Sequence, residues 1–198
     1  MRIKTSLLSA AFSLMFLSAF AQNEETVLGT RNLGFSGIWA GTKHQMTRFG
    51  NTNSYVYGWH FGLEFGKALT IGLGGYDLSD NILWDNQTSQ PFDIRWRTVS
   101  LGYGFQKFRA VHPVINVDAG RGTVRFANEG EDRIFVIQPS AGVEINLLRW
   151  FHLVLEGGYR FVTDSNISLS DEQLSGAYGQ ATLRFGFSWG RYRKPVRD

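Results

Sequence analysis

The sequence predicts an all-β protein, an eight-stranded antiparallel up-and-down transmembrane β-barrel. The clearest observation is a hairpin from Ile134 to Phe161, in which bulky apolar residues alternate with small or charged ones. Each arm has about a dozen residues, which is long for a globular sheet and fits a tilted strand that crosses a bilayer. The line that alternates with the bulky residues consists of small residues with single charges between them, whereas a water-facing surface is rich in Lys, Glu and Thr. The alternation therefore indicates an apolar line facing lipid and a crowded polar interior. A soluble barrel, with the apolar line in its core, is the alternative.

Composition agrees with this fold class. The chain has 198 residues, with 23 Gly, 16 Phe, 7 Tyr and 6 Trp, the residue classes that small membrane barrels use. It has no cysteine, which excludes disulfides, thiolate chemistry and acylation of a lipoprotein cysteine. The formal net charge of +3 is small and argues against nucleic acid as a partner.

The N-terminus carries the features of a secretory signal peptide over residues 1–21. Arg2 and Lys4 form a basic region, an apolar run follows from Leu7 to Phe20, and a small-x-small site ends at Ala21. We expect a periplasmic lead-in over residues 22–32, the barrel over 33–190, and a basic periplasmic tail over 191–198. Beyond residue 21 no run of eighteen apolar residues occurs, so no transmembrane helix is expected.

Eight strands are expected in the barrel region, and the two arms of the central hairpin are the sixth and seventh. The predicted ranges are Leu33–Arg48, Ser54–Gly66, Ala68–Ser79, Phe92–Gln106, Val111–Phe126, Ile134–Leu147, Phe151–Phe161 and Ser175–Trp189.

Alternation also predicts which side chains face outward. In the first strand these are Phe35, Gly37 and Trp39. The same pattern assigns outward positions in the second, fourth and eighth strands to Tyr55, Tyr57, Trp59, Phe61, Leu63 and Phe65, to Val99, Leu101, Tyr103 and Phe105, and to Ala181, Leu183, Phe185, Phe187 and Trp189. Alternation slips at Gly74-Gly75, which favours a β-bulge there. The pattern is also out of phase around Ile94–Arg97, and it assigns no facing to Arg95 and Arg97.

The predicted connections alternate between long and short. The long ones, Asp80–Pro91, Ala127–Asp132 and Thr163–Leu174, are rich in acidic residues, whereas the short turns around Lys67, Lys107–Arg109 and Arg149 are basic. Bacterial membrane barrels have long external loops and short periplasmic turns. We therefore expect the three long loops to be external.

Residues 33–189 resemble the small eight-stranded outer-membrane β-barrel proteins of Gram-negative bacteria. The segments Gly158–Val162, Leu174–Gly176 and Leu183–Phe187 look like the last strands of a functionally uncharacterised branch. One departure is that the chain continues beyond Trp189, whereas many relatives end in an aromatic residue. The resemblance implies a monomer in the outer membrane, with membrane lipids and, during insertion, the barrel-assembly machinery as its partners. An extracellular or periplasmic protein partner is also open.

The inward lines of the strands place six charged residues in the lumen. If the central hairpin turns about Trp150, Glu144 lies opposite Glu156 and Ser140 lies opposite Arg160. Two facing carboxylates could form an acid–base pair. An eight-stranded barrel, however, is just filled by its own side chains. We therefore expect a structural ion-pair network, with Arg160 and Arg184 between the acids. The expected lumen charges are Glu64, Asp118, Glu144, Glu156, Arg160 and Arg184, accompanied by His60, Gln138 and Gln180.

Catalytic, cofactor and metal sites are not predicted. Membrane barrels that modify lipid A use a His with a Ser and an acid, and only His44 is expected near the outer rim, without a His-x-Ser pairing. The acidic loops contain no ligand spacing for Ca²⁺ or Mg²⁺. The sequence therefore predicts a non-enzymatic integral barrel with a plugged polar lumen, which acts structurally or through adhesion or partner docking by its external loops. A lipid A-modifying enzyme is the alternative, and a narrow pore is a third, less favoured one.

Overall fold

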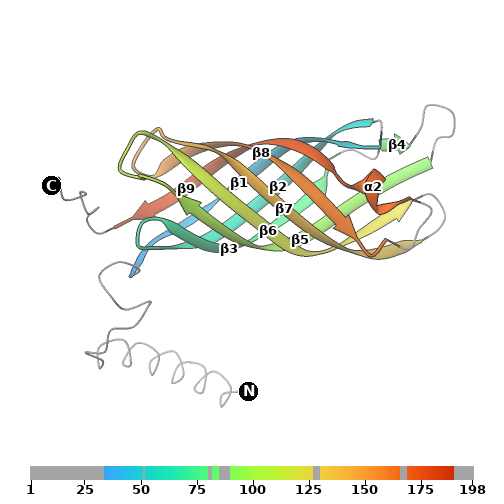
Figure 1. Cartoon of the computed structure of the whole chain (residues 1–198), viewed down its shortest axis with the longest axis horizontal. Coiled ribbons are helices and arrows are strands. Elements are labelled where there is room, and N and C mark those ends of the chain that lie inside the picture. The colour runs from blue at the N-terminus through green and yellow to red at the C-terminus, as the bar shows by residue number, and fades with distance from the viewer. Residues whose placement is uncertain are drawn as a thin grey trace, which may run out of the picture.

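The computed structural model describes residues 34–50, 52–79, 82–84, 90–126, 130–165 and 169–189. They form one antiparallel sheet with the order β3-β2-β1-β9-β8-β7-β6-β5, and pairing of β3 with β5 closes it. The predicted eight-stranded antiparallel up-and-down barrel is thus confirmed (Figure 1). The predicted signal peptide, lead-in and basic tail lie outside the described residues.

The eight barrel strands lie within a few residues of the predicted ranges. They are β1 (Phe35–Phe49), β2 (Thr52–Phe65), β3 (Leu69–Leu78), β5 (Gln90–Gly104), β6 (Val111–Phe126), β7 (Glu131–Asn146), β8 (Phe151–Thr163) and β9 (Gly176–Ser188).

Two short elements occur in connections that were predicted as loops. β4 (Ile82–Trp84) pairs with β5, and α2 (Asp171–Leu174) is a single turn begun by a capping box at Ser170. Both lie at one end of the barrel, called the loop end below (Figure 1). The opposite end, called the turn end, holds the start of β1, the end of β9 and the short turns. No helix among the described residues is long and apolar enough to cross a membrane.

The outer wall carries a broad band of exposed apolar side chains. Leu155 is 42% exposed and Val99 is 57% exposed, although burial of such residues is the main driving force of folding in water. The outward assignments made for β2, β9 and the turn-end half of β5 are confirmed. The band includes Ile38, Trp59, Phe61, Leu63, Ile71, Leu73, Leu101, Ile115, Val117, Val143, Leu155 and Phe185.

Strand β1 corrects the predicted facing of Gly37 and Trp39. The β1–β2 register shifts between Phe35 and Gly37, so Ser36 and Gly37 both point inward. Beyond this bulge the parity is inverted: Trp39 is only 1% exposed, and Lys43 is also inside. The prediction that Gly37 and Trp39 face outward was therefore wrong, while that for Phe35 was right.

The prediction of a β-bulge at Gly74-Gly75 was also wrong. Strands β2 and β3 pair without a break from Val56↔Leu78 to Phe65↔Leu69. Gly75 keeps its outward place, but the Trp59 side chain lies over it. A Cβ atom at Gly75 would approach Trp59 Nε1 to 2.6 Å. The glycine therefore makes room for a neighbouring ring rather than for an extra residue.

The loop end of the barrel contains an apolar core inside the wall. Arg95 and Arg97 face outward, whereas Phe92, Ile94 and Trp96 point inward, and the β5–β6 register is unbroken. Outward residues are therefore apolar in one half of β5 and charged in the other. The cluster consists of Phe49, Val56, Tyr76, Phe92, Ile94, Trp96, Val124, Ile134, Val136, Val162, Leu169 and Leu174. The strands thus run beyond the apolar band into a section built like a water-soluble barrel.

This assignment predicts the response to arginine on the outer face of β8. Leu155→Arg, inside the band, should lower the free energy of unfolding by about 2–4 kcal/mol because its charge would face hydrocarbon. Thr163→Arg, on the same face at the exposed end of the strand, should cost less than about 1 kcal/mol. Urea unfolding of both variants in lipid vesicles measures the difference. Equal stability of the two variants would refute the lipid-facing assignment.

Candidate functional site

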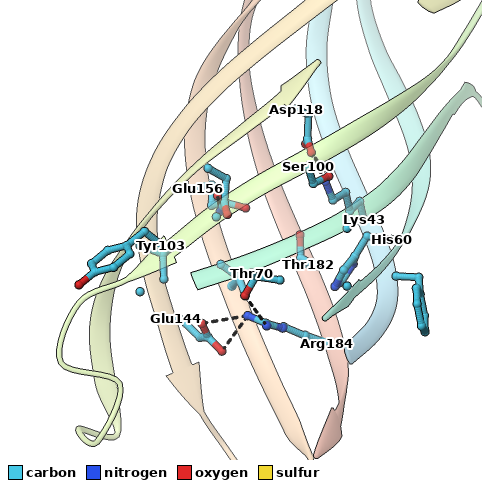
Figure 2. Close-up of a pocket in the computed structure, with 18 of the residues that line it drawn as sticks. Lys43, His60, Thr70, Ser100, Tyr103, Asp118, Glu144, Glu156, Thr182 and Arg184 are labelled. Atoms are coloured by element: carbon cyan, nitrogen blue, oxygen red, sulfur yellow. Dashed lines mark hydrogen bonds and ion pairs between the residues drawn. The ribbon is translucent and has the colours of Figure 1, made fainter. Parts of the chain in front are cut away.

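The candidate site is the polar interior of the barrel, which all eight barrel strands line. Figure 2 shows Lys43, Asp118, Glu144, Glu156 and Arg184 pointing into it from different strands. Its cavity measures ≈ 60 Å³, room for a few water molecules. All six predicted lumen charges do point inside, but they are not joined as the sequence suggested.

Glu64 and Lys107 close the turn end. Lys107 lies in the turn after β5 and folds back into the barrel, where its Nζ donates to Glu64 Oε2 at 2.9 Å. Ser36 Oγ and Ser188 Oγ donate to the other oxygen of Glu64 at 3.1 and 2.5 Å. Burial, and next the charge of Arg184, lower the pKa of Lys107. The sequence placed Lys107 in a basic periplasmic turn and missed this inward contact.

Glu144 is the centre of the second cluster. Arg184 Nη1 donates to both of its oxygens, at 3.4 and 3.3 Å. His152 Nδ1 lies 2.5 Å from Oε1, and His112 Nε2 lies 3.4 Å from Oε2. Arg184 also donates to Thr70, as Figure 2 shows. Glu144 is 1% exposed, so these partners compensate a carboxylate that has left water.

Imidazole and carboxylate groups are also the donors that transition metals prefer. Here, however, the Glu144 carboxylate already forms an ion pair with the guanidinium group of Arg184. Within the described ranges no group of three or more His, Cys, Asp or Glu residues is arranged to hold a metal ion.

Asp118 is the centre of the third cluster, at mid-height in the barrel. It accepts hydrogen bonds from Lys43 Nζ at 2.7 Å, from the Tyr76 hydroxyl at 2.5 Å and from Ser100 Oγ. Lys43 also donates to the Tyr76 hydroxyl at 2.7 Å. Sequence reasoning missed both Lys43 and Tyr76. Lys43 lies inside because the bulge at Ser36-Gly37 inverts the parity of β1, and the sequence carries no signal of that bulge.

Glu156 has uncharged partners. It accepts from Asn116 Nδ2, from Ser140 Oγ at 2.9 Å and from Gln180 Nε2 at 3.3 Å. The expected pair of facing carboxylates does not form, because Glu156 lies opposite Gly142 and Glu144 lies opposite Val154.

The register of the central hairpin explains this error. Leu148 and Phe151 exchange backbone hydrogen bonds, and Asn146 then pairs with His152, so the turn is not centred on Trp150. Ser140 consequently lies opposite Gly158 rather than Arg160.

Arg160 is buried in the loop-end core and not between the acids. Its guanidinium group donates to the Leu174 carbonyl at 2.9 Å, Thr47 Oγ1 at 3.1 Å and the Arg48 carbonyl at 3.3 Å. It also lies 4.0 Å from the centre of the Phe49 ring. No carboxylate of the described chain forms an ion pair with it. Arg160 therefore links Leu174, the last residue of α2, to Thr47 and Arg48 of β1.

The histidines fall into two groups. His60, His112 and His152 belong to the interior, and His60 lines the cavity. His44 lies on the outward side of β1, with Nδ1 2.5 Å from the Tyr55 hydroxyl and Nε2 3.1 Å from Thr42 Oγ1. Neither partner of His44 is a serine or a carboxylate.

The ion-pair geometry predicts a specific coupling. Glu144→Gln leaves Arg184 buried without its countercharge and should cost about 3–5 kcal/mol, and adding Arg184→Met should recover part of that loss. Urea unfolding of the single and double variants gives the coupling energy. Arg184→Met combined with Glu156→Gln is the matched control, and its effects should add to within about 0.5 kcal/mol. Coupling to Glu156 instead would contradict the pairing described here.

Comparison with known proteins shows the fold. No protein-family model matches the chain, and no curated protein sequence matches it. The N-terminal β-barrel domain of Pseudomonas aeruginosa OprF matches with a TM-score of 0.58 and 10% identity, over 78% of this chain and 99% of that domain. Neisserial surface protein A matches with a TM-score of 0.56 and 12% identity, over 79% of this chain and 99% of that one. The chain therefore has the fold of the small eight-stranded outer-membrane β-barrels, as its sequence resemblance indicated.

Proposed function

We propose that the protein is a non-enzymatic, monomeric integral protein of the outer membrane, with a lumen plugged by its own side chains. In this proposal its role is structural or lies in docking a partner at the loop end. The observation that carries it is the filled interior. The Glu64–Lys107 pair, the Glu144 and Asp118 clusters and the loop-end core succeed one another along the barrel.

Charge compensation supports the plug. An eight-stranded barrel leaves little space beyond its inward side chains, and the cavity between the clusters is ≈ 60 Å³. A substrate would have to break buried ion pairs to enter, and breaking such a pair costs about 3–5 kcal/mol. The interior is therefore better suited to stability than to turnover or conduction.

The loop end supports docking as the role. The section beyond the apolar band has a packed core and a charged outer wall, so it can present its connections on a rigid support. Binding residues are often carried on loops that a rigid scaffold positions. The matched structures are outer-membrane β-barrels and supply the analogy for location.

Modification of lipid A is the alternative. Of the four histidines only His44 lies on the outward side, and its partners are Thr42 and Tyr55. Mass spectrometry of lipid A from a deletion strain tests this alternative, and an altered acyl pattern that His44→Ala also produces would favour it over the proposal.

A plugged barrel should not conduct. Planar-bilayer recordings of the refolded protein should show no steady single-channel conductance, because the lumen lacks a continuous water path in this proposal. Insertion is checked in parallel by protease protection of the barrel. A steady open level from inserted protein would contradict the plug.

Topology can be measured on whole cells. Single cysteines at Gly130 or Asp171, at the loop end, should react with a membrane-impermeant maleimide, because long loops of such barrels are external. Cysteines at Lys67 or Leu148, in the turns, should react only after the outer membrane is broken. Labelling of the turns on intact cells would invert the orientation.

A further inference from the structure

An arginine-lined groove lies on the outer wall at the loop end. Its charged residues come from three neighbouring strands: Arg95 and Arg97 from β5, Arg121 from β6 and Arg133 from β7. The groove measures ≈ 460 Å³ and is also lined by Thr123. None of the four arginines contributes to the interior clusters.

The positive charge of this face is only partly compensated. Arg97 forms two hydrogen bonds with Asp77, at 3.0 and 3.1 Å. Glu131 lies 3.5 Å from Arg95 and 3.1 Å from Arg125 and is shared between them. Within the part of the chain that the structure describes, Arg121 and Arg133 contact no carboxylate. Counting Asp93 as well, the described residues of this outward face comprise five arginines and three carboxylates.

Strand register holds these charges close together. Arg97 lies directly opposite Arg121 across β5 and β6, and Thr123 stands between Arg95 and Arg133 in the next row. Like charges directly opposite each other in a sheet are destabilising. An anion between the two rows would relieve this repulsion and accept several charge-assisted hydrogen bonds.

The groove borders the apolar band. In the row next to Arg97 and Arg121 toward the turn end, Val99 on β5 lies opposite Ala119 on β6, which lies opposite Ile137 on β7, and Val117 follows on β6. Val99, Val117 and Ile137 are exposed. In a membrane this border is the level of the lipid head groups, where arginine side chains meet anionic lipid. A lipid would place its phosphate among the arginines and its acyl chains along the band.

We propose that this groove binds a phosphorylated lipid head group of the membrane leaflet at the loop end. The inference rests on the proposed transmembrane placement and adds a named site to it. The adjoining apolar band is the reason to assign a lipid rather than a soluble anion. Arg121 and Arg133 supply positive charge that no carboxylate of the described residues compensates, while Asp77 and Glu131 hold Arg97 and Arg95 in position.

The test compares two double variants with the same loss of charge. Arg121→Gln/Arg133→Gln removes the two groove arginines that contact no described carboxylate, and Arg48→Gln/Arg109→Gln removes two exposed arginines elsewhere. Each protein, refolded in uncharged micelles, is titrated with bis-phosphorylated lipid A and followed by native mass spectrometry. The groove variant should bind about tenfold more weakly than the parent, and the control should bind as the parent does.

Further measurements identify the ligand and distinguish failure of the lipid site from failure of the proposed membrane placement. Fully dephosphorylated lipid A should bind the parent as weakly as the groove variant binds the phosphorylated form. Equal binding of both lipid forms, or equal weakening in the two double variants, would overturn the site. Binding of inorganic pyrophosphate as tightly as the lipid would overturn the lipid as occupant. Failure of the parent to insert into vesicles would instead overturn the membrane placement itself.

Discussion

Closure of the sheet is the constraint on which the rest of the structure depends. Inside a bilayer every backbone N–H and C=O group needs a partner within the protein, and pairing of β3 with β5 supplies the last row of hydrogen bonds. Closure with eight strands makes the interior narrow. Each inward carboxylate must then find its partners within that space, as Glu64 does with Lys107, Ser36 and Ser188. The clusters inside and the apolar band outside are both consequences of this geometry.

Strand positions and most facings could be predicted because lipid and lumen select different side chains at alternate positions. Strand β2, with outward Trp59, Phe61 and Leu63, is the clearest case. The errors arise where alternation carries no signal. One extra residue at Ser36-Gly37 inverts the facing of Trp39 and Lys43, and nothing in the local composition reveals it. Around Arg95 the strand keeps its parity while its surroundings change from lipid to water, so the pattern only looked out of phase.

The sequence predicted which charged residues lie in the interior better than it predicted which of them form pairs. Parity alone placed Asp118, Glu144 and Glu156 inside, but their partners depend on register and on strands distant in the sequence. Lys43 and Asp118 are separated by 75 positions, and Lys107 reaches Glu64 from a turn. Glu156 does not face Glu144 because the hairpin closes at Leu148 and Phe151 rather than about Trp150. It does not pair with Arg184 because the β8–β9 register sets Glu156 opposite Gln180 and Arg184 opposite His152.

The apolar core at the loop end has a consequence for biogenesis. Its inward residues, such as Phe92, Ile94 and Val124, lie beyond the band that faces lipid, on strands whose outer wall carries arginines. If the chain inserts with its loops leading, as the proposed topology implies, the arginines on the outer wall of this segment must pass the bilayer midplane, where charged residues are costly. Once across, packing of the core buries apolar surface against water. Because reversal would expose this core again, translocation of the loop end is easier to complete than to reverse.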